Sequence, residues 1–66
     1  MNIQVNGDPR QLADGATVAA LLAELGMTEK PVAVEVNRHL VPKRDHEGRV
    51  LSEGDQVEVV TLVGGG

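Results

Sequence analysis

Short runs of alternating apolar and polar residues recur along the chain, and such alternation is typical of strands with one buried face. Near the start, Ile3 and Val5 alternate with polar neighbours. In the middle, the valines of residues 32–36 alternate with Ala33 and Glu35. Each of these two runs therefore predicts a strand.

Turn-forming residues set the limits of two further strands. Residues 7–9 read Gly-Asp-Pro, which is typical of a turn and predicts a returning hairpin strand over residues 10–13. Residues 37–38 are expected to turn the chain again, into a short strand at residues 39–41 that ends before a proline. The chain then contains a second predicted hairpin.

The last third of the chain is polar before it becomes apolar again. We expect residues 43–49 to form a polar loop, because they contain almost only charged residues and glycine. Val50 and Leu51 are then expected to return to the core. Residues 56–63 are rich in valine and predict the final strand.

One segment has helical spacing instead. Its apolar residues lie at i, i+3, i+4 and i+7 and form a single stripe, made of Val18, Leu21, Leu22 and Leu25. Thr17 precedes them, and its hydroxyl can accept a hydrogen bond from an N–H of the first turn. Gly26 follows and suits the left-handed position that ends many helices. The segment predicts one helix that covers a sheet.

This order of elements predicts an α+β fold with a mixed, four- to five-stranded sheet packed on one main helix. If the first and last strands lie side by side in the centre, the fold is the ubiquitin-like β-grasp. We expect residues 1–63 to form this single domain and residues 64–66 to form a flexible glycine tail. Sixty-six residues leave no room for a second domain.

Composition excludes several classes of function. The chain has no Phe, Tyr, Trp or Cys, and its net charge is −4. An acidic chain without stacking rings is a poor ligand for nucleic acid, and its charge opposes binding to anionic membranes. No apolar run approaches the roughly 20 residues of a membrane span, and no signal peptide opens the chain. We expect a cytoplasmic protein.

No catalytic constellation is visible in the sequence. His39 and His46 stand apart from any Cys or ordered carboxylate spacing, and we expect both to be solvated side chains. Ser52 is the only serine, and no phosphate-binding loop of the Walker type occurs. We therefore expect no self-contained enzyme and no bound cofactor or metal.

The final strand has apolar residues where an outward-facing side chain is expected. Val60 and Leu62 fall on the face that Glu58 also occupies, by strand alternation. Two interpretations stay open: a central strand partly covered on its second face, or an exposed patch that docks a partner. For the second, we predict partner contacts from Val60, Leu62, Glu58 and Asp55, the acidic residues meeting a basic partner.

The sequence ends in Gly64-Gly65-Gly66. One interpretation is a frayed end. The other is functional: glycines let a backbone approach another surface closely, and three of them extend about 10 Å, enough to deliver a carboxylate into a narrow pocket. An ionised carboxylate is a poor electrophile and must first be activated. Since no phosphate-binding motif is present, a separate protein would have to activate the Gly66 carboxylate.

A set of segments spread over nearly the whole chain matches a known family pattern. They are the opening strand of residues 1–6, Thr17-Val18 before a Leu-rich helix, residues 36–43 (VNRHLVPK), residues 53–60 (EGDQVEVV) and the terminal Gly65-Gly66. Together they resemble the sulfur carrier proteins of thiamine biosynthesis, the ThiS family. Lys43 stands where the family usually has arginine, which keeps the charge.

The resemblance implies a ubiquitin-like β-grasp fold and a carrier that is not itself an enzyme. An E1-like adenylyltransferase would use ATP and magnesium to adenylate the Gly66 carboxylate. Sulfur from a donor such as a cysteine desulfurase would convert it to a thiocarboxylate, and thiazole synthase would use that sulfur to build the thiazole of thiamine. Gly66 would carry the sulfur, while Gly65 gives access.

Other functions stay open beside this one. The small subunit of molybdopterin synthase has a similar fold and tail, although it is usually longer and richer in Phe. A sulfur carrier for another pathway would use the same chemistry. A ubiquitin-like protein modifier would instead have its activated Gly66 attacked by a lysine of a target, and a purely structural interaction domain would use no tail chemistry.

Overall fold

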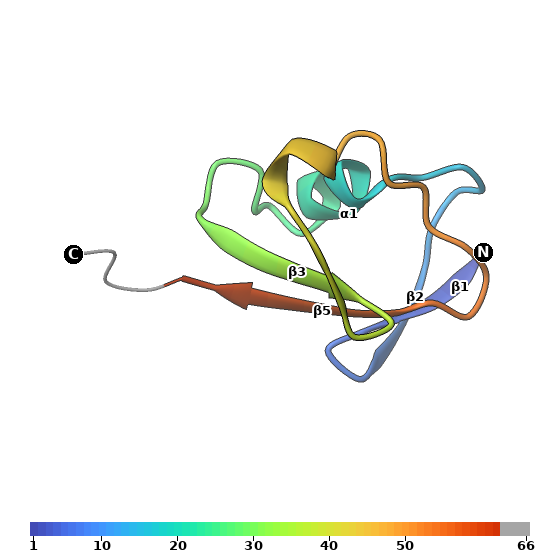
Figure 1. Cartoon of the computed structure of the whole chain (residues 1–66). Coiled ribbons are helices and arrows are strands. Elements are labelled where there is room, and N and C mark those ends of the chain that lie inside the picture. The colour runs from blue at the N-terminus through green and yellow to red at the C-terminus, as the bar shows by residue number, and fades with distance from the viewer. Residues whose placement is uncertain (63–66) are drawn as a thin grey trace.

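A five-stranded sheet with the strand order β2-β1-β5-β3-β4 carries one helix, α1, on one of its faces (Figure 1). The structure is a computed structural model and describes residues 1–62. The elements are β1 (Asn2–Val5), β2 (Asp8–Gln11), α1 (Val18–Glu24), β3 (Val32–Val36), β4 (His39–Val41), the 3₁₀ helix η1 (Lys43–Asp45) and β5 (Gln56–Thr61). This confirms the predicted α+β class and the mixed sheet.

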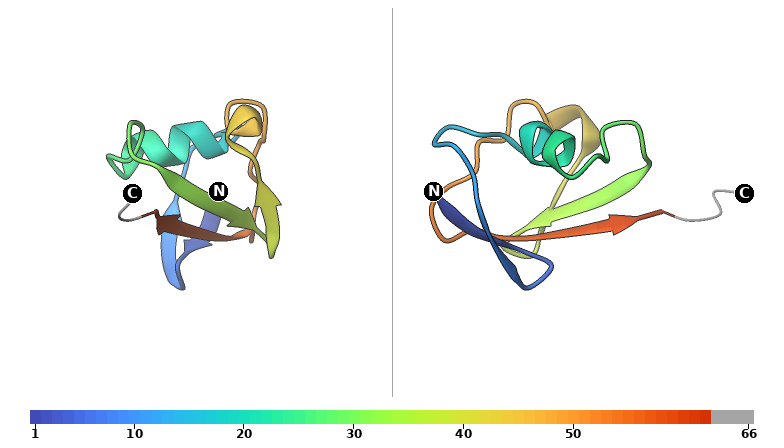
Figure 2. Two further views of the ribbon diagram at one scale, coloured as in Figure 1. Left: turned by 60° about the vertical axis from the view of Figure 1, so that its left-hand side comes forward. Right: turned by 180° about the vertical axis from the view of Figure 1, so that it is seen from behind.

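The first and last strands lie side by side in the centre of the sheet. β1 pairs with β5 in parallel, with Val5 opposite Val57, and β5 pairs with β3 antiparallel, from Val32–Thr61 to Val36–Val57. The two views of Figure 2 show the helix across one face and the other face of the sheet open. The arrangement is that of the ubiquitin-like β-grasp, as predicted.

The first hairpin is tighter than the sequence analysis predicted. Asn6 and Gly7 have φ values of 51° and 86°, so these two residues alone make the turn. Pairing resumes at once between Val5 and Asp8, and β2 covers Asp8–Gln11 rather than residues 10–13. The prediction was wrong because Pro9 was assigned to the turn. Proline is tolerated in β2 because β2 is an edge strand.

The helix forms where its apolar stripe predicts it. The Thr17 hydroxyl accepts a hydrogen bond from the Ala20 N–H at 3.1 Å, and Gly26 has a φ of +72° beyond the last turn. Both assignments are confirmed. The buried side of α1 packs on the inner side of the sheet, and the two form a single core. The core consists of Ile3, Val5, Leu12, Val18, Leu21, Leu22, Val34, Val36, Val41, Leu51, Val57 and Val59.

The segment after β4 differs most from its prediction. Residues 43–45 form η1 instead of an open loop, and η1 turns His46 inward, so that only 7% of His46 is exposed. Its Nε2 lies 3.0 Å from the Val41 carbonyl oxygen. The prediction of a solvated His46 was therefore wrong, whereas His39 is exposed as predicted.

A smaller difference concerns the return of the chain to the core. Leu51 is buried as predicted, but Val50 is 52% exposed, because the two residues point to opposite sides of an extended segment. Among residues 1–62, no helix is long and apolar enough to span a membrane.

The helix cap gives a test of the fold. Replacing Thr17 with alanine removes the hydroxyl that accepts from Ala20, and we expect the free energy of unfolding to fall by about 1 kcal/mol. Urea denaturation measures the change. Thr28→Ala, in an exposed loop position, is the control and should leave the midpoint unchanged. Equal effects of the two substitutions would contradict the capping role of Thr17.

Candidate functional site

Strand β5 leads directly to the residues that the sequence analysis singled out. The Leu62 N–H donates to the Pro31 carbonyl at 2.9 Å, which fixes the chain one residue beyond β5. The predicted tail, Gly64, Gly65 and Gly66, lies outside the described residues. What the structure defines is the root of the tail and the surface around it.

The side chain of Asn6 extends the pairing of β1 with β5 after β1 has ended. Its Oδ1 accepts from the Val59 N–H at 2.9 Å, and its Nδ2 donates to the Val59 carbonyl at 3.2 Å. The amide thus takes the place of a backbone peptide beside β5. Sequence analysis missed this role, although Asn followed by Gly after a strand is a signal for the tight turn that puts the side chain there.

A second amide fixes the start of β5. Asn37 Oδ1 accepts from the Gln56 N–H at 3.0 Å, and Asn37 Nδ2 donates to Asp55 Oδ1 at 3.0 Å. Asp55 Oδ2 in turn accepts from the Ser52 N–H at 2.8 Å. Both amide side chains come from turns, and together they hold β5 at its beginning and in its middle.

Asp55 is nearly buried, whereas its predicted contact with a partner requires an exposed carboxylate. It is only 9% exposed, and both carboxylate oxygens accept hydrogen bonds from within the chain. A partner could use this carboxylate only at the cost of those bonds. The structure instead gives Asp55 a role in positioning the strand that ends at the tail.

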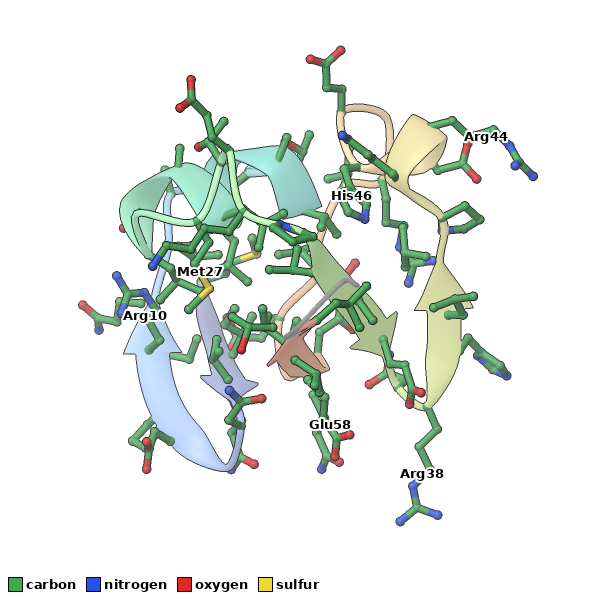
Figure 3. All side chains as sticks on the ribbon, turned by 90° about the vertical axis from the view of Figure 1, so that its left-hand side faces the viewer. Arg10, Met27, Arg38, Arg44, His46 and Glu58 are labelled. Carbon is green, nitrogen blue, oxygen red and sulfur yellow. The ribbon has the colours of Figure 1, made fainter. Side chains whose placement is uncertain are left out.

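The other three predicted contact residues are accessible. Val60 is 56% and Leu62 52% exposed, and Glu58 extends from the side of the sheet away from α1 (Figure 3). The prediction that Leu62 shares the face of Glu58 was wrong: Leu62 follows the end of β5 and lines a cavity with Lys30 and Lys43. Because Val57 and Val59 are buried toward the helix, Val60 occupies the opposite face together with Glu58. The described chain leaves these apolar side chains uncovered. Of the two interpretations left open, this favours a docking surface over a strand covered on both faces.

The same face carries an unfavourable charge pair. Glu58 on β5 lies directly opposite Glu35 on β3, and both side chains are exposed. Like charges at paired positions of a sheet destabilise it. Leu40, which is 65% exposed, is the partner of Glu35 on the next strand. The open face is therefore acidic with apolar residues, a composition suited to a basic partner with an apolar contact.

The described residues offer binding features but no reactive centre. No group of three or more His, Asp or Glu side chains within residues 1–62 is placed to hold a metal ion. The rigid β5, the open face and the tail root at Leu62 can present a chain terminus to another protein.

Comparison with known proteins gives a consistent assignment. The model of the ThiS family matches residues 3–66. A protein named sulfur carrier protein ThiS, from Thermus thermophilus, is 41% identical over 64 residues, which cover 97% of this chain and 98% of that one. The crystal structure of a thiamine biosynthesis protein (ThiS) from Geobacter metallireducens superposes with a TM-score of 0.84 at 32% identity, covering all of both chains.

Another relative is much longer than this chain. A protein named thiazole synthase, from Paramagnetospirillum magneticum, is 41% identical over 66 residues, which are all of this chain but only 20% of that protein. The chain thus spans about a fifth of the length of this relative. That protein therefore contains a segment similar to this chain and, in the same polypeptide, sequence that this chain lacks.

The Glu35–Glu58 pair predicts that the open face is not optimised for stability. Glu58→Lys converts a repulsive cross-strand pair into an attractive one, and we expect the free energy of unfolding to rise by about 0.2–1 kcal/mol. Thermal and urea unfolding at low salt measure it. Glu29→Lys makes the same charge change in a loop, and a gain of equal size there would show that net charge alone is responsible.

The Asn6 side chain predicts a larger effect. Asn6→Gly keeps the positive φ of the turn but removes both hydrogen bonds to Val59, so we expect a loss of about 1–3 kcal/mol in unfolding free energy. Asn6→Asp keeps the acceptor and loses the donor, and its unfolding free energy should lie between those of the wild type and Asn6→Gly. An Asn6→Gly variant as stable as the wild type would contradict the clamp.

Proposed function

The chain belongs to the ThiS family, and from that premise we propose that it is a sulfur carrier protein of thiamine biosynthesis. The observation on which the proposal mainly rests is that the family match extends through residue 66, so that it includes the glycine tail as well as the fold. Relatives named sulfur carrier protein ThiS and the structural match over the whole chain support it. They favour it over the molybdopterin synthase and protein-modifier alternatives.

In this proposal the carboxylate of Gly66 is the working group. A carboxylate oxygen attacks the α-phosphate of ATP in the active site of an E1-like adenylyltransferase that also holds magnesium, and pyrophosphate leaves. A persulfide, with sulfur supplied through a cysteine desulfurase or a related donor, then attacks the activated carbonyl carbon and displaces AMP. A thiol reductant cleaves the S–S bond of the resulting acyl disulfide, and the C-terminus is left as a thiocarboxylate.

The described residues would serve this chemistry by delivery. Residues 63–66 follow a strand that is fixed up to the Leu62–Pro31 hydrogen bond, and four residues can span at most about 13 Å. That reach allows the carboxylate to enter a partner's site while Val60, Leu62 and Glu58 contact the rim. Gly64 and Gly65 would permit a narrow entrance, because they have no side chain to exclude.

Thiazole synthase is the proposed recipient of the sulfur. The support is the thiazole synthase relative in which a unit like this chain forms about a fifth of the polypeptide. Linking two proteins in one chain raises their effective concentration at each other's sites, which is useful when one delivers a group to the other. We propose that the two functions cooperate in the same way when they are on separate chains.

Intact-mass spectrometry tests the carrier function. After incubation with the adenylyltransferase, ATP, magnesium and a sulfur donor, we expect exchange of one oxygen for sulfur, and no exchange when Gly66 is deleted. Glu58→Lys should slow the exchange, because it reverses a charge that faces the basic partner, although the variant folds at least as well. Glu29→Lys is the matched control.

Two results would contradict the proposal. An unchanged mass after incubation with an adenylyltransferase from the same organism would contradict the carrier function. Adducts on target lysines in place of the sulfur exchange would instead indicate a protein modifier.

A further inference from the structure

A groove runs along the side of the molecule between α1 and η1. Two adjoining cavities of about 590 and 430 Å³ form it, and both are lined by Leu22, Thr28, Lys43 and His46. One end lies at Ala19 and Glu47, and the other reaches Val32 and Leu62. The groove thus ends at the root of the tail, although it lies on a different side of the molecule from the open sheet face.

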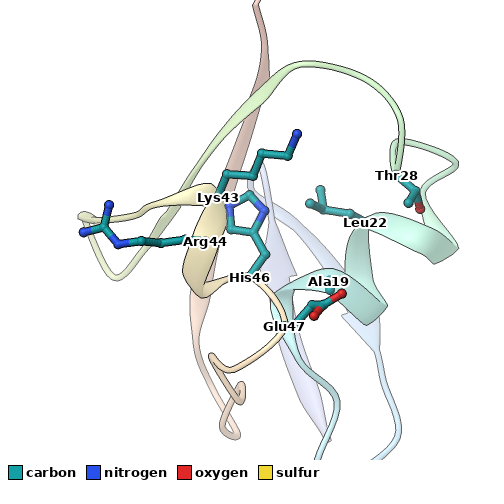
Figure 4. Close-up of a pocket in the computed structure, with 7 residues that line it drawn as sticks. All are labelled: Ala19, Leu22, Thr28, Lys43, Arg44, His46 and Glu47. Atoms are coloured by element: carbon teal, nitrogen blue, oxygen red, sulfur yellow. The ribbon is translucent and has the colours of Figure 1, made fainter.

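The interior of the groove combines an apolar floor with a polar wall that carries the ammonium group of Lys43. Leu22, Met27 and Pro31 contribute apolar surface. Lys43 and His46 stand opposite Leu22 and Thr28, whereas Arg44 extends away from them (Figure 4). His46 is held by its contact to the Val41 carbonyl, so this wall is built into the fold.

The groove carries more basic than acidic side chains, although the protein as a whole is acidic. Lys30, Lys43 and Arg44 line it, against Glu29 and Glu47. Within residues 1–62, the ion pairs are those of the N-terminus with Asp14 and of Arg10 with Glu24. Lys30 and Lys43, at the walls of the groove, therefore have no ionic partner in the described chain.

We propose that this groove is a second docking site, which receives an acidic segment with an apolar side chain from thiazole synthase. The carboxylate would pair with Lys43, and the apolar side chain would lie on Leu22 and Ala19. The inference rests on the proposed function for the identity of the partner. The continuity of the groove with Leu62 links it to the enzyme that receives the tail.

Charge and shape select this occupant over a free anion. Glu29 and Glu47 also line the groove, and they would repel a ligand with several negative charges such as a nucleotide phosphate. The chain has no aromatic side chain on which a base could stack. An acidic peptide segment with one apolar side chain satisfies both the cationic wall and the apolar floor.

The two surfaces would then have opposite preferences. The open sheet face, with Glu35 and Glu58, fits a basic surface, while the groove fits an acidic one. A partner that satisfies both can bind in only one orientation, because a reversed orientation places like charges together. This orientation would direct the tail into one site of the partner.

Calorimetric titration of thiazole synthase with the full chain tests the groove. Lys43→Glu should weaken binding about tenfold, while Arg49→Glu, an equal charge reversal outside the groove, should change it by no more than about twofold. Ala19→Leu fills the floor and should also weaken binding. Ala20→Leu, one position along α1 and exposed, is its control. Thermal unfolding verifies that each variant folds.

The outcomes separate this inference from the proposed function. A chain lacking Gly64–Gly66 should still bind and still respond to Lys43→Glu. Unchanged binding of Lys43→Glu, an equal loss with Arg49→Glu, or no binding by the tail-deleted chain would overturn the groove, even if the thiocarboxylate forms normally. Failure of the wild-type chain to form the thiocarboxylate would instead count against the carrier function itself.

Discussion

The structure depends on the support of β5 from both sides. β1 lies along it in parallel and β3 antiparallel, so the strand that ends at the tail is the central strand of the sheet. Two asparagine side chains from turns extend this support, Asn37 at the start of β5 and Asn6 at its middle. Because unpaired backbone groups are costly, these amides keep β5 extended where its neighbours have ended. A rigid strand of this kind can deliver whatever follows it.

A single helix on one face of the sheet leaves the other face free for binding. A chain of this size has few apolar residues, and many of them are buried between the α1 stripe and the inner valines of the sheet. The exposed Val60 and Leu40, and the Glu35–Glu58 repulsion, do not contribute to stability. Their presence fits the proposed contact with other proteins. The same reasoning applies to the cationic groove, where charges remain unpaired within the described chain.

Local patterns predicted most of the fold. The Thr17 cap and the Gly26 terminus followed from spacing, whereas the central position of the first and last strands stayed a condition that only the family resemblance favoured. The errors lie where tertiary packing decides. Residues 43–45 have no apolar period, yet they form η1 because its turn buries His46 against Val41. The exposure of Val60 was left open, since alternation cannot tell whether the second face of a sheet is covered. Asp55 was expected at a partner surface, and only the loop geometry gave its carboxylate internal donors.

We propose that sulfur travels on Gly66 to thiazole synthase. The most direct measurement loads the chain with a heavy sulfur isotope, removes the donor, and adds thiazole synthase with its other substrates in a single turnover. We expect the label to appear in the thiazole product while the chain returns to its unlabelled carboxylate form. Unlabelled thiazole, with the label retained on the carrier, would contradict it.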